Sequence, residues 1–100
     1  MLVIVWEYRA RPDRIEDFEA LYRADGAWAR LFQGAPGFVS TTLMKDVRDP
    51  LRFMVADRWT SETPYDEFKR DHDAEYATLS RRGEALFERE QLLGRFDFRD

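Results

Sequence analysis

The sequence predicts one α+β domain with a ferredoxin-like fold, in which helices cover one face of a four-stranded antiparallel sheet. Segments rich in β-branched and aromatic residues alternate with segments of helical apolar spacing in the order β-α-β-β-α-β. The chain has 100 residues, of which 44% are hydrophobic, so it can bury a single core. Because its composition does not shift along its length, we expect residues 1–100 to form one domain.

Apolar spacing and turn residues place the individual elements. Residues 46–50 are typical of a hairpin turn, so the strands on either side of them should pair antiparallel. Helical spacing of apolar side chains continues from Ile15 to Phe32, with a kink or short break expected at Gly26. The expected strands cover residues 2–9, 38–45, 51–60 and 92–98, and the expected helices cover residues 14–32, 64–70 and 74–89.

Two sequence patterns mark the beginnings of helices. Asp13 and Glu16 have the spacing of a capping box, in which the first side chain caps the helix and the second reaches back to it. Thr63 precedes Pro64, and proline is favoured at the first position of a helix because its missing N–H costs nothing there. We therefore expect Asp13 and Thr63 to be N-caps.

The first and last strands carry apolar side chains on both faces. The alternating sets are Leu2, Ile4, Trp6 and Tyr8 against Val3, Val5, Glu7 and Arg9 in the first strand, and Leu92, Gly94, Phe96 and Phe98 against Leu93, Arg95 and Asp97 in the last. A large exposed apolar patch is uncommon on monomers, so we expect the uncovered face to be buried in a two-fold symmetric homodimer. The alternative is a monomer with an unusually apolar sheet face.

Composition excludes several classes of partner and site. The chain has 16 basic and 20 acidic residues, a net charge of −4 and no basic stripe, so we expect no nucleic-acid partner. It has no run of about 18 apolar residues and no basic leader, so we expect no membrane segment, no signal peptide and a cytoplasmic location. Because cysteine is absent, disulfides, thiolate zinc sites and a cysteine nucleophile are excluded.

Features spread over nearly the whole chain resemble one known family. They are Pro36-Gly37-Phe38 before the second strand, Asp57-Arg58-Trp59-Thr60-Ser61 before a helix, and Tyr65, Phe68, His72 and Tyr76 within it. Together with the element order, they resemble the antibiotic biosynthesis monooxygenase family. The resemblance implies a dimeric α+β barrel in which each subunit holds its own pocket between the sheet and the helices. It also implies a cofactor-independent monooxygenase that oxidises a small phenolic or polycyclic aromatic compound with molecular oxygen, without a metal ion.

The heme-degrading relatives of that family can be compared residue by residue. They carry an Asn on the first strand, and a Trp and then a His on the helix after the third strand. Aligned on Trp59, the Trp position falls on Phe68 and the His position on Thr78, and the first strand offers Glu7 or Tyr8 instead of Asn. The axial ligand of heme iron is missing there, which disfavours heme breakdown, although His72 could bind iron from a different place.

His72 is the first candidate for a catalytic residue. It is the only histidine, and an imidazole is the side chain that ordinarily changes protonation near neutral pH. We expect it to be the general base that removes a proton from a phenolic or enolic substrate, leaving an electron-rich anion that can pass an electron to oxygen. Alternatively, His72 caps a helix or pairs with Asp71 and Asp73.

Aromatic side chains supply the other candidates. Tyr65, Phe68, His72 and Tyr76 are spaced by 3, 4 and 4 residues, so they would share one face of a continuous helix. The expected catalytic residues are His72, Trp59 and Tyr76, and the expected substrate-binding residues are Trp6, Trp28, Phe32, Tyr65 and Phe68. The alternative is that these aromatic side chains pack the core.

Asp57 and Arg58, with Glu7 on a neighbouring strand, are expected to form an internal ion pair of structural importance only. Two other functions stay open beside the monooxygenase. One is a non-catalytic dimer that holds a small metabolite in the same pocket. The other is an isomerase or lyase that abstracts a proton without using oxygen.

Overall fold

The computed structural model describes residues 1–99. The strands are β1 (Leu2–Ala10), β2 (Phe38–Lys45), β3 (Arg52–Trp59) and β4 (Phe87–Asp97), and the helices are α1 (Ile15–Tyr22), α2 (Ala27–Phe32), α3 (Glu62–Asp71) and α4 (Asp73–Glu84). Neighbouring strands pair antiparallel in the order β2-β3-β1-β4. The ferredoxin-like α+β fold predicted from the sequence is therefore confirmed.

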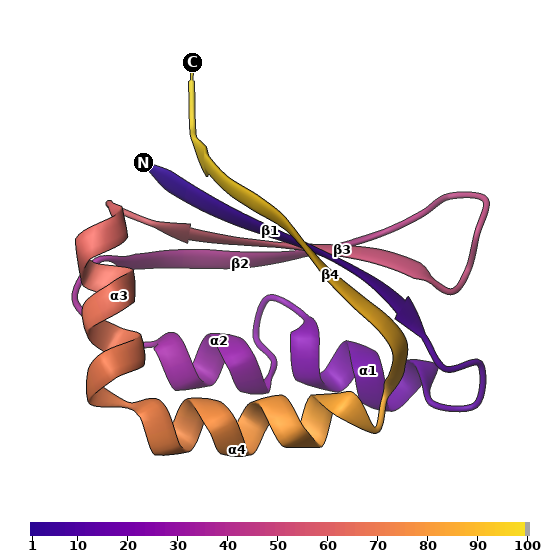
Figure 1. Ribbon diagram of the computed structural model, residues 1–100. Coiled ribbons are helices and arrows are strands. Elements are labelled where there is room, and N and C mark those ends of the chain that lie inside the picture. The colour runs from indigo at the N-terminus through magenta and orange to yellow at the C-terminus, as the bar shows by residue number, and fades with distance from the viewer. Residues whose placement is uncertain (100) are drawn as a thin grey trace.

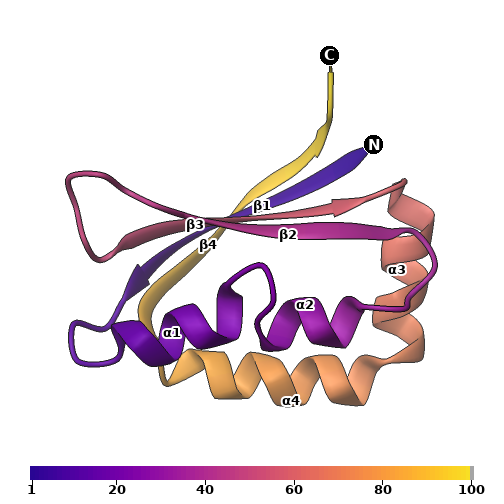
Figure 2. The ribbon, with the colours of Figure 1, turned by 180° about the vertical axis from the view of Figure 1, so that it is seen from behind.

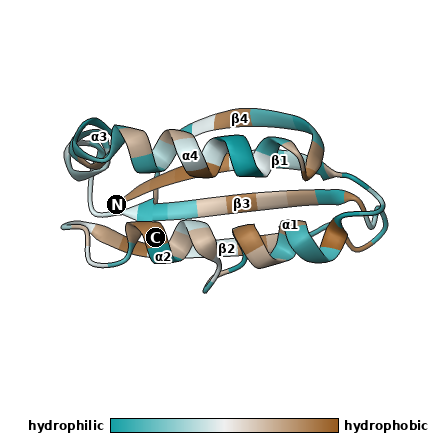
Figure 3. Cartoon of the chain, turned by 90° about the horizontal axis from the view of Figure 1, so that it is seen from below, coloured by the Kyte–Doolittle hydropathy of each residue, from teal (hydrophilic) through white to brown (hydrophobic). Residues whose placement is uncertain are grey.

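The molecule has two layers. The sheet forms one, and α1, α2 and α4 lie together on a single face of it, while α3 stands at one end of the sheet (Figures 1 and 2). Seen from below, α1 and α2 follow one another beside α4. The middle of β3 is hydrophobic and it becomes hydrophilic toward both ends, whereas hydrophilic residues predominate in α4 (Figure 3). Within residues 1–99, no helix combines the length and the apolar character needed to cross a membrane.

The break expected at Gly26 is present, and it separates α1 from α2. A β-carbon at position 26 would lie 2.6 Å from the carbonyl oxygen of Ala20, so the tight turn between the helices needs glycine. The capping box expected just before α1 is wrong. Arg14 occupies the N-cap position without a side-chain capping bond, and its guanidinium instead donates to the Asp17 carboxylate at 2.8 Å.

The boundaries of α3 and α4 also differ from expectation. Ser61 is the residue before α3, so the prediction of Thr63 as N-cap is wrong, and Pro64 lies in the first turn, where a missing N–H still costs nothing. The prediction that α4 continues to residue 89 is wrong as well. Phe87 pairs with Ala10 of β1, and this strand pairing overrides the helical spacing of the apolar residues.

Aromatic rings fill the core between the layers. Near one end Phe18 stacks on Tyr22, with ring centroids 4.5 Å apart, and contacts the tilted ring of Phe53 at 4.9 Å. Near the other end Trp59, which is fully buried, contacts Phe32 at 5.4 Å. Such ring pairs add to the stability that burial alone supplies.

Gly83 of α4 lies against Tyr22 of α1. Replacing an exposed helical glycine by alanine normally stabilises a helix by about 1 kcal/mol. Here a β-carbon would collide with the Tyr22 hydroxyl, and the stacking on Phe18 fixes that ring. We expect Gly83→Ala to destabilise the protein by about 1–3 kcal/mol in urea unfolding. Tyr22→Phe in the same chain removes the clashing oxygen and should recover most of the loss, whereas a stabilised Gly83→Ala protein would contradict this packing.

The expected ion pair among Glu7, Asp57 and Arg58 is not formed. Successive strand residues face opposite sides of a sheet, so Asp57 faces the helices while Arg58 and Glu7 face away from them. Glu7 instead accepts from the Arg52 guanidinium at 2.6 Å, and the Arg58 guanidinium lies 4.7 Å above the Phe98 ring. The prediction of that ion pair is therefore wrong, and the carboxylate of Asp57 needs another explanation.

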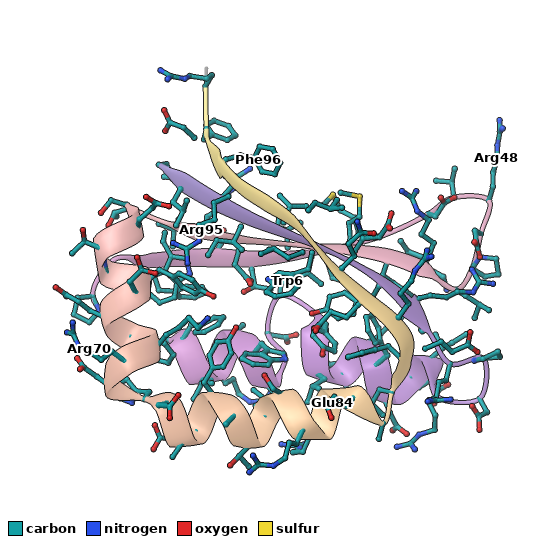
Figure 4. All side chains as sticks on the ribbon, in the orientation of Figure 1. Trp6, Arg48, Arg70, Glu84, Arg95 and Phe96 are labelled. Carbon is teal, nitrogen blue, oxygen red and sulfur yellow. The ribbon has the colours of Figure 1, made fainter. Side chains whose placement is uncertain are left out.

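The sheet face away from the helices is uncovered in the single chain. Large apolar side chains on it are solvent-exposed, including Phe96 at 51% and Met44 at 43%. Figure 4 shows Phe96 on the side of the sheet opposite to the helices, whereas Trp6 of the adjacent strand points toward them. Both faces of the sheet are therefore apolar, as the sequence predicted.

Candidate functional site

A cavity of about 180 Å³ lies between the sheet and the helix layer. All of the elements except β2 contribute to its wall. The lining residues are Trp6, Tyr8, Tyr22, Trp28, Phe32, Val55, Asp57, Lys69, Tyr76, Ser80 and Glu90. Six of these eleven side chains are aromatic, so the cavity presents ring faces and edges with a few polar groups among them.

Asp57 is the buried polar group of this cavity. It lies on the inward face of β3, between Ile4 of β1 and Thr41 of β2, and is 7% exposed. Thr41 donates a hydrogen bond of 2.7 Å to Asp57 Oδ1. Within residues 1–99, no Lys, Arg or His side chain forms an ion pair with this carboxylate.

The protonation of Asp57 follows from that environment. Burial disfavours the charged carboxylate and raises its pKa from 3.8 to about 6, although the hydrogen bond from Thr41 acts in the opposite direction. A carboxyl group with a pKa near the working pH can both accept and return a proton. Asp57 therefore has the properties of a general base inside an aromatic cavity.

Glu90 lines another part of the cavity, together with Tyr8 of β1 and Tyr22 of α1. Its Oε2 accepts a hydrogen bond of 2.7 Å from the Tyr8 hydroxyl, which belongs to its register partner on β1. Burial is the largest cause that raises the pKa of Tyr8, and the same holds for Tyr22. Both phenols therefore stay protonated at neutral pH, and the Tyr8 hydroxyl is the donor to Glu90.

Lys69 and Tyr76 line the cavity on the side of α3 and α4. The Tyr76 hydroxyl lies 3.4 Å from that of Tyr65, and Lys69 Nζ lies 4.9 Å from the centre of the Tyr76 ring. The Nε1 of Trp28 is buried beside the Tyr22 hydroxyl, whose pKa its N–H acts to lower, and it makes no other hydrogen bond among residues 1–99.

The structure brings several predicted site residues together. Trp6, Trp28, Phe32 and Tyr76 all line the cavity, and Tyr65 reaches it through its contact with Tyr76. Trp59 and Phe68 are buried but do not line it. Their rings pack on each other at 5.8 Å between centroids, within the neighbouring core.

His72 lies outside this cavity. It occupies the junction between α3 and α4, where its ring stacks on Phe68 at 4.6 Å and its Nδ1 lies 3.2 Å from Glu75 Oε2. It lines a separate surface groove of about 370 Å³ beside residues 33–36. Neither Asp71 nor Asp73 is its partner, because Glu75 is the carboxylate that follows His72 at helical spacing.

Sequence reasoning missed the other lining residues, namely Tyr8, Tyr22, Val55, Asp57, Lys69, Ser80 and Glu90. One signal for Asp57 was present. It belongs to the same alternating set as Phe53, Val55 and Trp59, all of which are buried. A charged residue in the apolar set of a strand indicates a carboxylate that faces the core, where burial shifts its pKa.

No group of three or more His, Asp or Glu side chains in residues 1–99 has an arrangement that could hold a metal ion.

Comparison with known proteins places the chain in a family. Residues 1–79 match the family model described as antibiotic biosynthesis monooxygenase. The chain belongs to this family. The resemblance noted in the sequence is therefore confirmed, and no curated protein matches the chain by sequence.

Solved structures of low sequence identity share the fold of this family member. A variant of SnoaB, a cofactor-independent oxygenase from Streptomyces nogalater, matches with a TM-score of 0.79 and 19% identity, over 99% of this chain and 93% of that one. PA3566 from Pseudomonas aeruginosa matches with a TM-score of 0.73 and 19% identity, over 99% and 94% of the two chains. At these identities the similarity establishes the fold alone.

Proposed function

We propose that this family member is a cofactor-independent monooxygenase that oxidises a small phenolic compound with molecular oxygen, with Asp57 as its general base. The observation that carries the proposal is a carboxylate, 7% exposed and without an ion-pair partner in residues 1–99, in the wall of an aromatic cavity. A phenol fits this environment because its ring packs on aromatic walls and its O–H donates to the carboxylate. Family membership and the fold shared with SnoaB support the reaction class.

The size of the cavity limits the substrate. A cavity of about 150 Å³ in another protein accommodates one benzene molecule. The present cavity, of about 180 Å³, therefore fits one substituted aromatic ring. We propose a single-ring substrate such as a hydroquinone, and not the polycyclic compound that the sequence left as an alternative.

The chemistry assigned to Asp57 is one proton transfer. Asp57 takes the proton of a ring hydroxyl, and the resulting phenolate is electron-rich enough to pass an electron to oxygen. For a hydroquinone, one oxygen atom then enters the ring and the other leaves as water, so that hydroquinone and O₂ give hydroxybenzoquinone and water. The ring itself is the reductant, and no further co-reactant is required.

Oxygen uptake tests this proposal. The protein is incubated in air with methylhydroquinone and, in parallel, with anthrone as a polycyclic compound. We expect oxygen consumption above the uncatalysed rate with methylhydroquinone and much less with anthrone. Binding of the single-ring compound without turnover would favour a non-catalytic ligand-binding protein instead. Turnover of an enolic compound without oxygen would favour an isomerase or lyase.

We also propose that the protein is a cytoplasmic homodimer that pairs through the uncovered face of the sheet. The exposed side chains Met44 and Phe96 support this arrangement, because a second copy related by two-fold symmetry would remove the same surface from water on both chains.

Phe96→Asp is expected to disrupt this dimer, because it places a charge in the apolar surface that the two copies share. Light scattering at micromolar concentration should give the dimer mass for the unchanged protein and the monomer mass for Phe96→Asp. Val47→Asp is the matched control, since Val47 is 96% exposed in the β2–β3 turn. A monomeric mass for the unchanged protein would contradict the proposal.

A further inference from the structure

The two carboxylates of the cavity wall differ in their surroundings. Asp57 is buried, and among residues 1–99 its side-chain hydrogen bond is the one from Thr41. Glu90 is exposed, and its Oε2 accepts from the Tyr8 hydroxyl. In the described part of the chain Glu90 forms no salt bridge and its Oε1 accepts no hydrogen bond, so Oε1 can accept from a group at this side of the cavity.

Two cationic groups already lie over aromatic rings on the α3 side of the cavity. Lys69 Nζ lies 4.9 Å from the ring centre of Tyr76, and the Tyr65 ring has Lys69 Nζ at 5.6 Å and the Arg95 guanidinium at 5.1 Å. Ammonium groups are attracted to the faces of such rings because the ring quadrupole is negative there. The Tyr8 ring itself is buried against the Tyr22 and Phe87 rings, so at this side of the cavity the carboxylate of Glu90, bonded to the Tyr8 hydroxyl, is the group that attracts a cation.

The charges of the lining side chains favour a positive group on the ligand. Asp57 and Glu90 are acidic, Lys69 is the basic side chain of the lining set, and no arginine belongs to that set. A carboxylate or phosphate on the ligand would lie near two acidic groups, which disfavours anionic compounds. An ammonium would instead meet Glu90 and the aromatic rings.

We propose that the aromatic substrate carries a protonated amine on a short side chain, which Glu90 binds while the ring hydroxyl faces Asp57. The inference rests on the proposed function, because it assumes that the phenolic end of the substrate lies at Asp57. It assigns substrate specificity to Glu90. The substrate class is then a phenol or hydroquinone with an aminoalkyl arm.

Three ligands of similar size and different charge test this assignment. Tyramine carries an ammonium, 4-ethylphenol is neutral in the side chain, and 4-hydroxyphenylacetate carries a carboxylate. Dissociation constants are measured by calorimetry at about pH 7.5, where the amine is protonated and Asp57 is ionised. We expect tyramine to bind about tenfold more tightly than 4-ethylphenol, and 4-hydroxyphenylacetate to bind most weakly.

Glu90→Gln isolates the contribution of the charge, because the amide oxygen still accepts from the Tyr8 hydroxyl. The ratio of the tyramine and 4-ethylphenol constants should fall to within about twofold of unity in this variant. Glu88→Gln is the matched control on the same strand, where the carboxylate lies 3.8 Å from Arg9 and outside the cavity wall. It should keep the ratio of the unchanged protein.

The outcomes separate this inference from the proposed function. Equal binding of tyramine and 4-ethylphenol, or tightest binding of 4-hydroxyphenylacetate, would overturn the role of Glu90 and leave a phenol-binding cavity in place. A preference for tyramine that survives Glu90→Gln would also overturn it. If none of the three ligands binds, the phenol-binding cavity itself is wrong, and the proposed function fails with the inference.

Discussion

Asp57→Asn is expected to lower the rate of oxygen uptake with methylhydroquinone by about 10²- to 10⁴-fold, the range typical for removal of a general base. Asparagine has nearly the same shape as aspartate, and its amide oxygen can still accept from Thr41. It cannot take a proton from the substrate. The loss should therefore appear mainly in kcat, with little change in the binding of 4-ethylphenol.

A second variant distinguishes the two candidate bases. His72→Ala removes the imidazole, which stacks on Phe68 in a separate groove and does not line the cavity. Asp13→Asn is the control for Asp57→Asn, because it removes the same charge in the exposed loop before α1. If His72→Ala abolishes oxygen uptake while Asp57→Asn retains it, the base is His72, as the sequence suggested, and the assignment to Asp57 is wrong.

Asp57→Asn is also expected to change the free energy of unfolding in a pH-dependent way. The variant should gain about 3 kcal/mol of stability, relative to the unchanged protein, between pH 4 and pH 8. The pKa of Asp57 is about 6 in the folded chain and 3.8 ordinarily, so folding favours the protonated form. The carboxyl group therefore costs no stability below about pH 4. Its cost grows as the pH rises from about 4 to 6 and is complete above that range.

Urea unfolding of both proteins at pH 4, 6 and 8, at one protein concentration, measures this difference. Other carboxylates act in the opposite direction, since backbone hydrogen bonds hold the pKa of Asp46 at about 2 and lower that of Asp49. They are common to both proteins and cancel in the comparison. A stability difference that does not change with pH would show that Asp57 titrates at its ordinary pKa.

Most of the helices and strands could be predicted from the residues near each position. The strand β2 and the break at Gly26 follow from features within a few residues of each position. The boundary between α4 and β4 does not, because Phe87 and Leu86 continue the helical spacing of the residues before them. What ends the helix is the pairing of Phe87 with Ala10, a contact between residues far apart in the sequence.

The residues of the cavity could be predicted from the sequence only in part. Trp6 and Trp28 were expected as wall residues, with packing of the core as the alternative, and both line the cavity. His72 was placed with Tyr65 and Tyr76 on the assumption of one continuous helix. In the structure α3 ends at Asp71 and α4 begins at Asp73, so the direction of the chain changes at His72 and moves its imidazole away from the cavity.

Asp57 lines the cavity, although the sequence analysis did not predict it as a site residue. Its neighbour Arg58 suggested an ion pair from sequence proximity, although adjacent residues on a strand face opposite sides of the sheet. Strict use of that alternation would have placed the carboxylate in the core with Val55 and Trp59. The inward position of Asp57 could thus be predicted from strand periodicity, whereas the structure was needed to show that no basic side chain in residues 1–99 forms an ion pair with it.

The most direct test of Asp57 as a buried base is an NMR titration of its side-chain carboxyl carbon, with and without 4-ethylphenol, assigned by comparison with Asp57→Asn. We expect a midpoint near pH 6 in the free protein. We also expect a changed midpoint when the phenol is bound, because the ring hydroxyl then donates to the carboxylate. A midpoint near 3.8 that the phenol leaves unchanged would contradict both the buried base and its place in the ligand cavity.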